Sequence, residues 1–161
     1  MKKILSLLII FFSVFLVACS ESRAPLNSED VISVIESRGD IEWANWTYNP
    51  SGNPHHQAVS LYLTTLDMRY RVRFAEFTTV ELTEREYNVG VSNLRRRTIT
   101  DEDMLALTET SGRNFDLMVA QNEIYFYIFY RIENTLLTGE LRSSEYMDEF
   151  IDLINELKGL R

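Results

Sequence analysis

The sequence predicts a single α+β domain that has one antiparallel sheet of about five strands, with helices mostly on one face. Three segments carry this prediction. Residues 68–77 alternate apolar side chains with arginines, which is typical of a strand with one wet face. Residues 123–133 (EIYFYIFYRIE) are apolar on both faces, which indicates a strand inside the sheet. Apolar residues between positions 147 and 157 recur at spacings of three and four, as expected of a helix packed on a sheet.

The first half of the domain is predicted to contain one helix followed by three strands. A helix is expected over residues 28–38, because Asn27 or Ser28 can cap its first turn and Gly39 suits the position after its last turn. The strands are expected at residues 42–48, 57–65 and 68–77. A loop rich in Pro, Gly and Asn separates the first strand from the second.

Two capping boxes predict helices in the second half of the domain. The box at residues 83–86 (TERE) starts a helix that is expected to end near residues 95–97, and the box at 100–103 (TDED) starts a short helix that stops at residues 111–112. A hairpin with arms 115–119 and 123–133 should follow. Ser143 or Ser144 then caps the final helix, after a link at residues 136–146 (LLTGELRSSEY).

The first 18 residues have the pattern of a signal peptide. Two lysines precede an apolar run, residues 4–17, which is shorter than the roughly 20 residues that cross a bilayer and which ends beside Cys19, the only cysteine. Residues 16–19 (LVAC) resemble the lipobox of bacterial lipoproteins, and the resemblance implies cleavage before Cys19 and palmitate-type acyl chains on it. An uncleaved anchor or ordinary secretion are the alternatives.

This resemblance implies a signal peptide (residues 1–18), a lipidated cysteine with a tether (19–27) and a globular domain (28–161). The domain would face the periplasm or the extracellular side, and Ser20 in place of Asp implies the outer membrane if the host has two membranes. The polar segment 20–27 (SESRAPLN) predicts an extended tether that spans about 26 Å. Cleavage lowers the Lys and Arg count from 16 to 14 against 24 acidic residues, so the formal charge changes from −8 to −10. That charge argues against a nucleic-acid partner.

The sequence shows no recognisable catalytic or metal-binding motif, so we expect no catalytic residue, metal or cofactor. The histidines, His55 and His56, are adjacent in a loop, where a solvated pair is favoured over a zinc site. Acidic groups such as Asp101 with Asp103 fit the start of a helix better than a calcium or acid–base site. An enzyme of unrecognised type remains an alternative.

A binding surface is predicted on the sheet, where arginines line one face of residues 68–77 about 7 Å apart. The candidate residues are Arg69, Arg71, Arg73, Tyr125 and Tyr127. Arginine and aromatic side chains stack on one another and are enriched at protein interfaces. The alternatives are an intramolecular ion-pair ladder with Glu76 and neighbouring carboxylates, or a cover formed by the second helix. The basic triplet at residues 95–97 either contacts anionic lipid or complements the end of a helix dipole.

The element order and the strands MRYRVRF and EIYFYIFYRI, with the glycine-containing link LLTGELRSSEY, resemble the YbjN-like and type III secretion chaperone-like folds over residues 27–157. The resemblance implies a binding or adaptor domain without catalytic residues. The expected function is therefore a non-enzymatic binding or adaptor domain on a cell-envelope membrane, which binds an envelope protein. A structural or lipid-contacting envelope component is the alternative.

Overall fold

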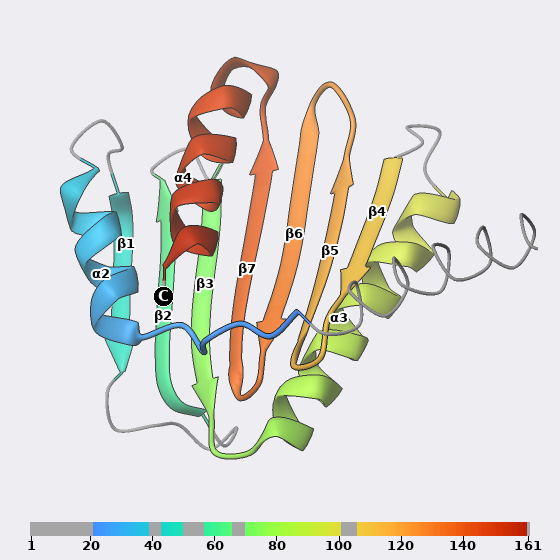
Figure 1. Ribbon diagram of the computed structural model, residues 1–161. Helices are drawn as coiled ribbons and strands as arrows, with labels where there is room; N and C mark the ends of the chain where they lie inside the picture. The colour runs from blue at the N-terminus through green and yellow to red at the C-terminus, as the bar shows by residue number, and fades with distance from the viewer. Residues whose placement is uncertain (1–20, 39–42, 50–56, 66–69, 101–105, 161) are drawn as a thin grey trace, which may run out of the picture.

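The structure, a computed structural model, describes residues 21–38, 43–49, 57–65, 70–100 and 106–160. Within these ranges seven strands form one sheet in the order β1-β2-β3-β7-β6-β5-β4 (Figure 1). Every neighbouring pair is antiparallel. The strands are β1 (Trp43–Asn49), β2 (Gln57–Thr65), β3 (Tyr70–Phe77), β4 (Ala106–Ser111), β5 (Phe115–Gln121), β6 (Tyr125–Ile132) and β7 (Thr135–Arg142). The helices are α2 (Ser28–Ser37), α3 (Val80–Thr100) and α4 (Met147–Gly159), and a 3-10 turn (Ser144–Tyr146) precedes α4.

The predicted α+β domain with an antiparallel sheet is confirmed, and the described sheet has seven strands instead of about five. The additional strands are β4 and β7. Residues 136–146 were predicted to be a link, yet β7 lies at the centre of the sheet between β3 and β6. The short helix predicted from residue 100 to residues 111–112 was wrong for residues 106–111, because Ala106–Ser111 pairs with β5 as an edge strand, while residues 101–105 lie outside the described residues.

Among the described helices, α2 and α4 lie on one face of the sheet and α3 lies on the other (Figure 1). The larger core lies between the sheet and the pair α2 and α4, and it contains Phe74, Ile128 and Phe150. Gly139 in β7 allows this close packing, because a Cβ atom there would lie 3.0 Å from Phe150 Cζ. Helix α3 covers the other face through two smaller apolar clusters, one of which includes Val91 and Leu94.

Helix α3 begins one turn earlier than the sequence predicted. It starts at Val80, and the Thr79 side chain accepts a hydrogen bond from Leu82 N at 3.3 Å, as expected of a cap. Thr83, the predicted cap, is fully buried in the first turn and its hydroxyl donates to the Thr79 carbonyl oxygen at 3.1 Å. The helix also continues past the basic triplet to Thr100, so the prediction that it ends near residues 95–97 was wrong.

Residues 21–27 form a strap, here called the N-terminal strap, which crosses the α2/α4 face of the sheet (Figure 1). Leu26 is 3% exposed and belongs to the main core. The Asn114 side chain forms hydrogen bonds with both backbone polar groups of Arg23. Its Oδ1 accepts from Arg23 N at 2.9 Å, and its Nδ2 donates to Arg23 O at 2.7 Å. Arg113 N donates to Glu21 O at 2.9 Å. The prediction of an extended tether over residues 20–27 was therefore wrong for residues 21–27, which are part of the folded domain.

Across the described ranges, we find no helix that combines the length and the apolar character needed to cross a membrane.

Candidate binding face

The predicted site residues that the structure describes lie on one face of the sheet. Arg71 and Arg73 come from β3, and Tyr125 and Tyr127 come from β6, with β7 between these strands. Side chains alternate along a strand, and the intervening residues of β3 and β6 belong to the core under α2 and α4. The four predicted residues therefore lie on the α3 side. Arg69 and Cys19 lie outside the described residues.

The strand register brings these side chains into rows across the sheet. Arg71 pairs with Glu140 of β7, and Glu140 pairs with Tyr127 of β6. In the next row, toward the start of β6, Tyr125 pairs with Arg142. The Tyr125 ring stacks on the Tyr127 ring, with 6.4 Å between the two centroids. The arginines and tyrosines predicted from the sequence share this face, whereas Glu140 and Arg142 were missed because they belong to the strand that was predicted to be a link.

Glu140 is the anion at the centre of this arrangement. Its Oε2 accepts from Arg71 Nη1 at 3.1 Å, and its Oε1 accepts from Arg142 Nε at 2.6 Å. The hydrogen bond to Glu140 raises the pKa of Arg142 above its ordinary value. Glu140 is only 17% exposed as a side chain, so this three-residue group is partly shielded from water. Arg71 thus has an internal ion-pair partner, which was one of the two alternatives to a binding role.

The partner that the sequence analysis named for that alternative, Glu76, was wrong. Glu76 lies an odd number of residues from Arg71 along β3 and therefore on the opposite face of the strand. Its side chain accepts from Asn134 Nδ2 at 3.4 Å. Glu140 takes the role expected of Glu76 because β7, not a loop, lies beside β3.

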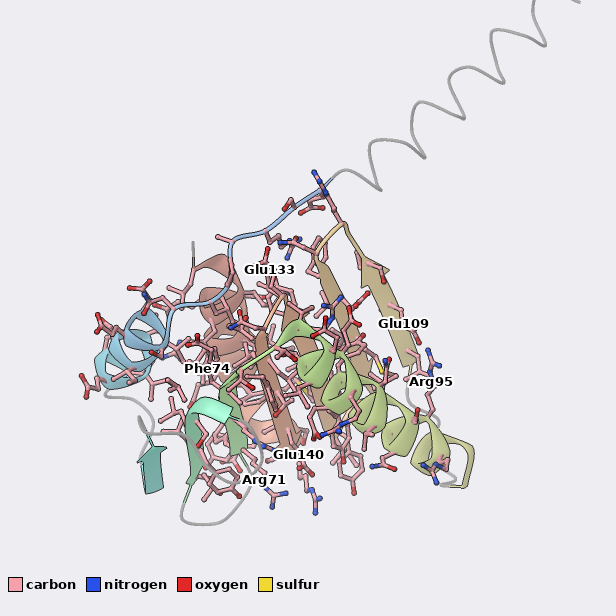
Figure 2. The ribbon with its side chains drawn as sticks, turned by 90° about the horizontal axis from the view of Figure 1, so that it is seen from below. Arg71, Phe74, Arg95, Glu109, Glu133 and Glu140 are labelled. Atoms are coloured by element: carbon pink, nitrogen blue, oxygen red, sulfur yellow. The ribbon has the colours of Figure 1, made fainter. Side chains whose placement is uncertain are left out.

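Helix α3 covers only part of this face. Gly90 lies directly on the Phe129 ring, since a Cβ atom there would be 2.3 Å from Phe129 Cε1. Tyr127 packs against the apolar cluster that contains Val91 and Leu94 of the same helix. Figure 2 shows Arg71 and Glu140 beside α3, on the same side of the sheet and not beneath the helix. The second alternative, a cover formed by the helix, therefore applies to Phe129 and not to the arginines.

Arg73 differs from Arg71 because it is exposed and, among the described residues, forms no ion pair. Across the strand pair it faces Tyr62 of β2, which is half-buried. We call Tyr62, Arg71, Arg73, Tyr125, Tyr127 and Arg142 the arginine–tyrosine face. It combines the exposed guanidinium of Arg73 with planar aromatic rings, and such side chains anchor protein interfaces.

The other candidate sites of the sequence contribute less. In the basic triplet, Arg95 forms an ion pair with Glu109 of β4, and Arg96 Nη2 donates to Asn93 Oδ1 at 3.1 Å. His55, His56, Asp101 and Asp103 lie outside the described residues. Asp148 and Glu149 stand in the first turn of α4, where negative charge complements the helix dipole. Within the described ranges no group of His, Cys, Asp and Glu is arranged to hold a metal ion.

A buried charge network under α3 went unnoticed in the sequence. Arg131 is 8% exposed, and its Nε and Nη2 donate to Asp116 Oδ2 at 2.9 and 2.6 Å. Its Nη1 lies 3.4 Å from Glu84 Oε1 of α3. The sequence contains one indication of this network, because Arg131 is a charged residue within the apolar run of β6. The network ties α3 to the sheet and leaves Arg131 inaccessible to a partner.

No protein-family model, curated protein or solved structure matches this chain. A functional proposal therefore depends on the residues and geometry described above.

Proposed function

We propose that this protein is a lipid-anchored, non-enzymatic binding domain of a bacterial cell envelope, and that it recognises an acidic partner protein through the arginine–tyrosine face. The observation that carries the proposal is the exposure of Arg73 on a sheet face that no described helix covers at that point. The opposite face of the same strands is filled by α2 and α4.

The charge of the face supports an acidic partner. Arg71, Arg73 and Arg142 carry three positive charges against the single carboxylate of Glu140, in a chain whose formal charge is −8. A local positive surface on an acidic protein selects partners by electrostatic complementarity and raises the rate of association. Tyrosine rings beside arginines supply rigid contact area at little entropic cost.

The lipid anchor is supported by the lipobox-like residues 16–19 and by the single cysteine within them. The resemblance to YbjN-like and type III secretion chaperone-like domains is consistent with a binding role, because the described order begins with a helix, three strands and a helix and ends with a helix. The second half holds four strands where the resemblance expected two.

The binding role is tested with Arg73→Glu. Arg71→Glu is less suitable, because it would place a second carboxylate beside Glu140 and so perturb the fold as well as the surface. The matched control is Arg85→Glu, which makes the same charge change at a side chain that is 63% exposed on α3. The full-length protein is crosslinked in its native membranes and recovered by affinity.

We expect a stoichiometric partner with the wild-type protein and Arg85→Glu, and at least a tenfold loss with Arg73→Glu while the thermal unfolding midpoint is unchanged. Equal recovery with all three proteins, or no partner with any of them, would refute binding through this face. The anchor is tested separately with Cys19→Ser, which should remove the acyl mass increment that intact-mass measurement detects on the wild-type protein. A wild-type protein without that increment, or the same increment on Cys19→Ser, would contradict lipidation.

A further inference from the structure

A pocket with a cavity volume of about 490 Å³ lies on the α2/α4 face, on the opposite side of the sheet from the arginine–tyrosine face. The N-terminal strap forms one wall, Tyr130 and Ile132 of β6 form the floor, and the last residues of α4 with Leu160 form the other wall. Figure 1 shows the strap crossing this face close to the C-terminal end of α4. The pocket exists only because the strap is docked.

Arg23 supplies a fixed guanidinium to this pocket. Its Nη1 donates to Tyr130 OH at 2.8 Å, and its Nη2 donates to Glu21 Oε1 at 2.8 Å. The guanidinium carbon lies 4.2 Å from the centre of the Phe115 ring. These contacts hold the positive charge in one position, and hydrogen bonding to Tyr130 raises the pKa of Arg23. The charge is therefore organised before any ligand binds.

Lys158 supplies a second cation to the pocket. It is half-buried in the last turn of α4, and it forms no ion pair or hydrogen bond with any described residue. Burial, and then the charge of Arg23, lower the pKa of the Lys158 ammonium. The only carboxylate that lines the described pocket is that of Glu21, which is already bonded to Arg23. The pocket thus has an excess of one positive charge, and an anion would relieve it.

The remainder of the lining is suited to a ligand with an apolar part. Ala24, Ile132 and Leu160 contribute apolar side chains, and the volume lies within the range of about 300–1,000 Å³ typical of small-molecule sites. A bare inorganic ion would leave most of this volume empty. A molecule with one anionic group and an apolar body fits both the charge and the size.

The position of the strap indicates where such a molecule comes from. Glu21 lines the pocket and lies two residues from Cys19, a distance of at most about 7 Å along an extended chain. If Cys19 is acylated, as proposed above, the pocket lies at the level of the lipid headgroups. We propose that the pocket binds an anionic phospholipid, with Lys158 and Arg23 on the phosphate and the apolar side chains of Ala24, Ile132 and Leu160 beside the first carbons of its acyl chains. This inference rests on the proposed lipid anchor.

The test is calorimetric titration of the full-length lipidated protein in a neutral detergent. The probes are dihexanoyl-phosphatidylglycerol, glycerol 3-phosphate and dihexanoylglycerol, so that the amphiphile, the soluble phosphate ester and the uncharged lipid are compared. The variants are Lys158→Gln and Lys158→Arg. Arg113→Gln is the control, because Arg113 is an exposed cation next to the strap whose side chain does not line the pocket.

We expect dihexanoyl-phosphatidylglycerol to bind at least tenfold more tightly than glycerol 3-phosphate, and dihexanoylglycerol not to bind. Lys158→Gln should weaken the binding of the anionic lipid at least tenfold, whereas Lys158→Arg and Arg113→Gln should change it less than threefold. No binding of the anionic lipid, or equal binding by Lys158→Gln, would overturn the assignment. Equal affinity for glycerol 3-phosphate would overturn the lipid source and identify a soluble phosphate ester. Intact mass of the same sample reports acylation independently, so failure of the anchor and failure of the pocket are distinguishable.

Discussion

The docking of the N-terminal strap can be tested by one substitution in its anchor, Leu26→Ala. Leu26 is 3% exposed and belongs to the same core as α2 and α4, and its backbone N–H donates to Thr135 Oγ1 at 3.4 Å. In a flexible tether this leucine would lie in water, and its truncation would leave stability unchanged. In the described structure it fills the core, and truncation creates a cavity.

The expected loss in the free energy of unfolding follows from the number of buried carbon atoms that the substitution removes. Leu26→Ala removes three carbon atoms from an almost fully buried side chain, and each contributes about 0.8 kcal/mol, which gives about 2.4 kcal/mol for transfer alone. The residual cavity adds to this value, so we expect a loss of about 2.5–4 kcal/mol in the free energy of unfolding. That loss corresponds to a decrease of about 10 °C in the melting temperature of a domain of this size.

The assay is urea unfolding of the full-length protein in mild detergent, followed by far-UV circular dichroism. Leu107→Ala is the matched control, because it makes the same chemical change at a leucine that is 42% exposed on the edge strand β4. We expect the control to lose less than about 1 kcal/mol. If Leu26→Ala and Leu107→Ala lose the same small amount, the strap is not part of the folded core and the pocket described above does not persist in solution.

Three further predictions address the sheet and α3. Gly90→Ala should destabilise the protein by about 1–2 kcal/mol in urea unfolding, because overpacking against Phe129 exceeds the gain in helix propensity. Thr79→Ala should cost about 0.5–2 kcal/mol in the same assay, since it removes the acceptor for the first turn of α3. Burial raises the pKa of Tyr87 to about 12, so the stability that its neutral form contributes is complete below pH 10 and lost as the pH rises toward 12. Tyr87→Phe should therefore show a shallower fall in melting temperature between pH 10 and 12.

The predictions for Gly90→Ala and Thr79→Ala each have a control on the same helix. Ser92→Ala is an exposed change in α3 and should be neutral or slightly stabilising, so a similar gain for Gly90→Ala would contradict the contact with Phe129. Glu86→Ala removes the partner of the capping box predicted from sequence and should cost less than Thr79→Ala. The reverse order would restore Thr83 as the cap. An unchanged alkaline slope in Tyr87→Phe would show that its hydroxyl is not shielded from water.

The elements that the sequence predicted well are those with a strong periodic pattern. Residues 57–65 and the second arm of the hairpin became β2 and β6 because their apolar residues face a core on at least one side. The edge strand β4 has no such pattern. All six of its residues are exposed, and its sequence (ALTETS) does not alternate between apolar and polar residues. This segment is a strand because it pairs with β5, and its own sequence does not predict that pairing.

Strand β7 was missed for a different reason. Gly139 interrupts its alternation and suggested a link, whereas the glycine provides room for α4 to pack closely on the sheet. The error extended to the site, because Glu140 belongs to this strand and could not be recognised as the partner of Arg71. The strap was missed because one buried leucine in a polar segment shows no periodicity. Alternation along each strand grouped the arginines with one another and the tyrosines with one another, whereas their position on one shared face depends on the pairing of both strands with β7.

The two proposed sites lie on opposite faces of one sheet, and this arrangement has a functional consequence. The pocket opens beside the strap on the α2/α4 face, whereas Arg73 lies on the α3 face. A domain that places the pocket against lipid headgroups therefore turns the arginine–tyrosine face away from the membrane, where an acidic partner has access to it. The two sites can be occupied at the same time, and Lys158→Gln should leave partner recovery unchanged while Arg73→Glu leaves lipid binding unchanged. A variant at either site that abolished both activities would show that the sheet transmits a structural change between its faces, and the sites would then have to be treated as one.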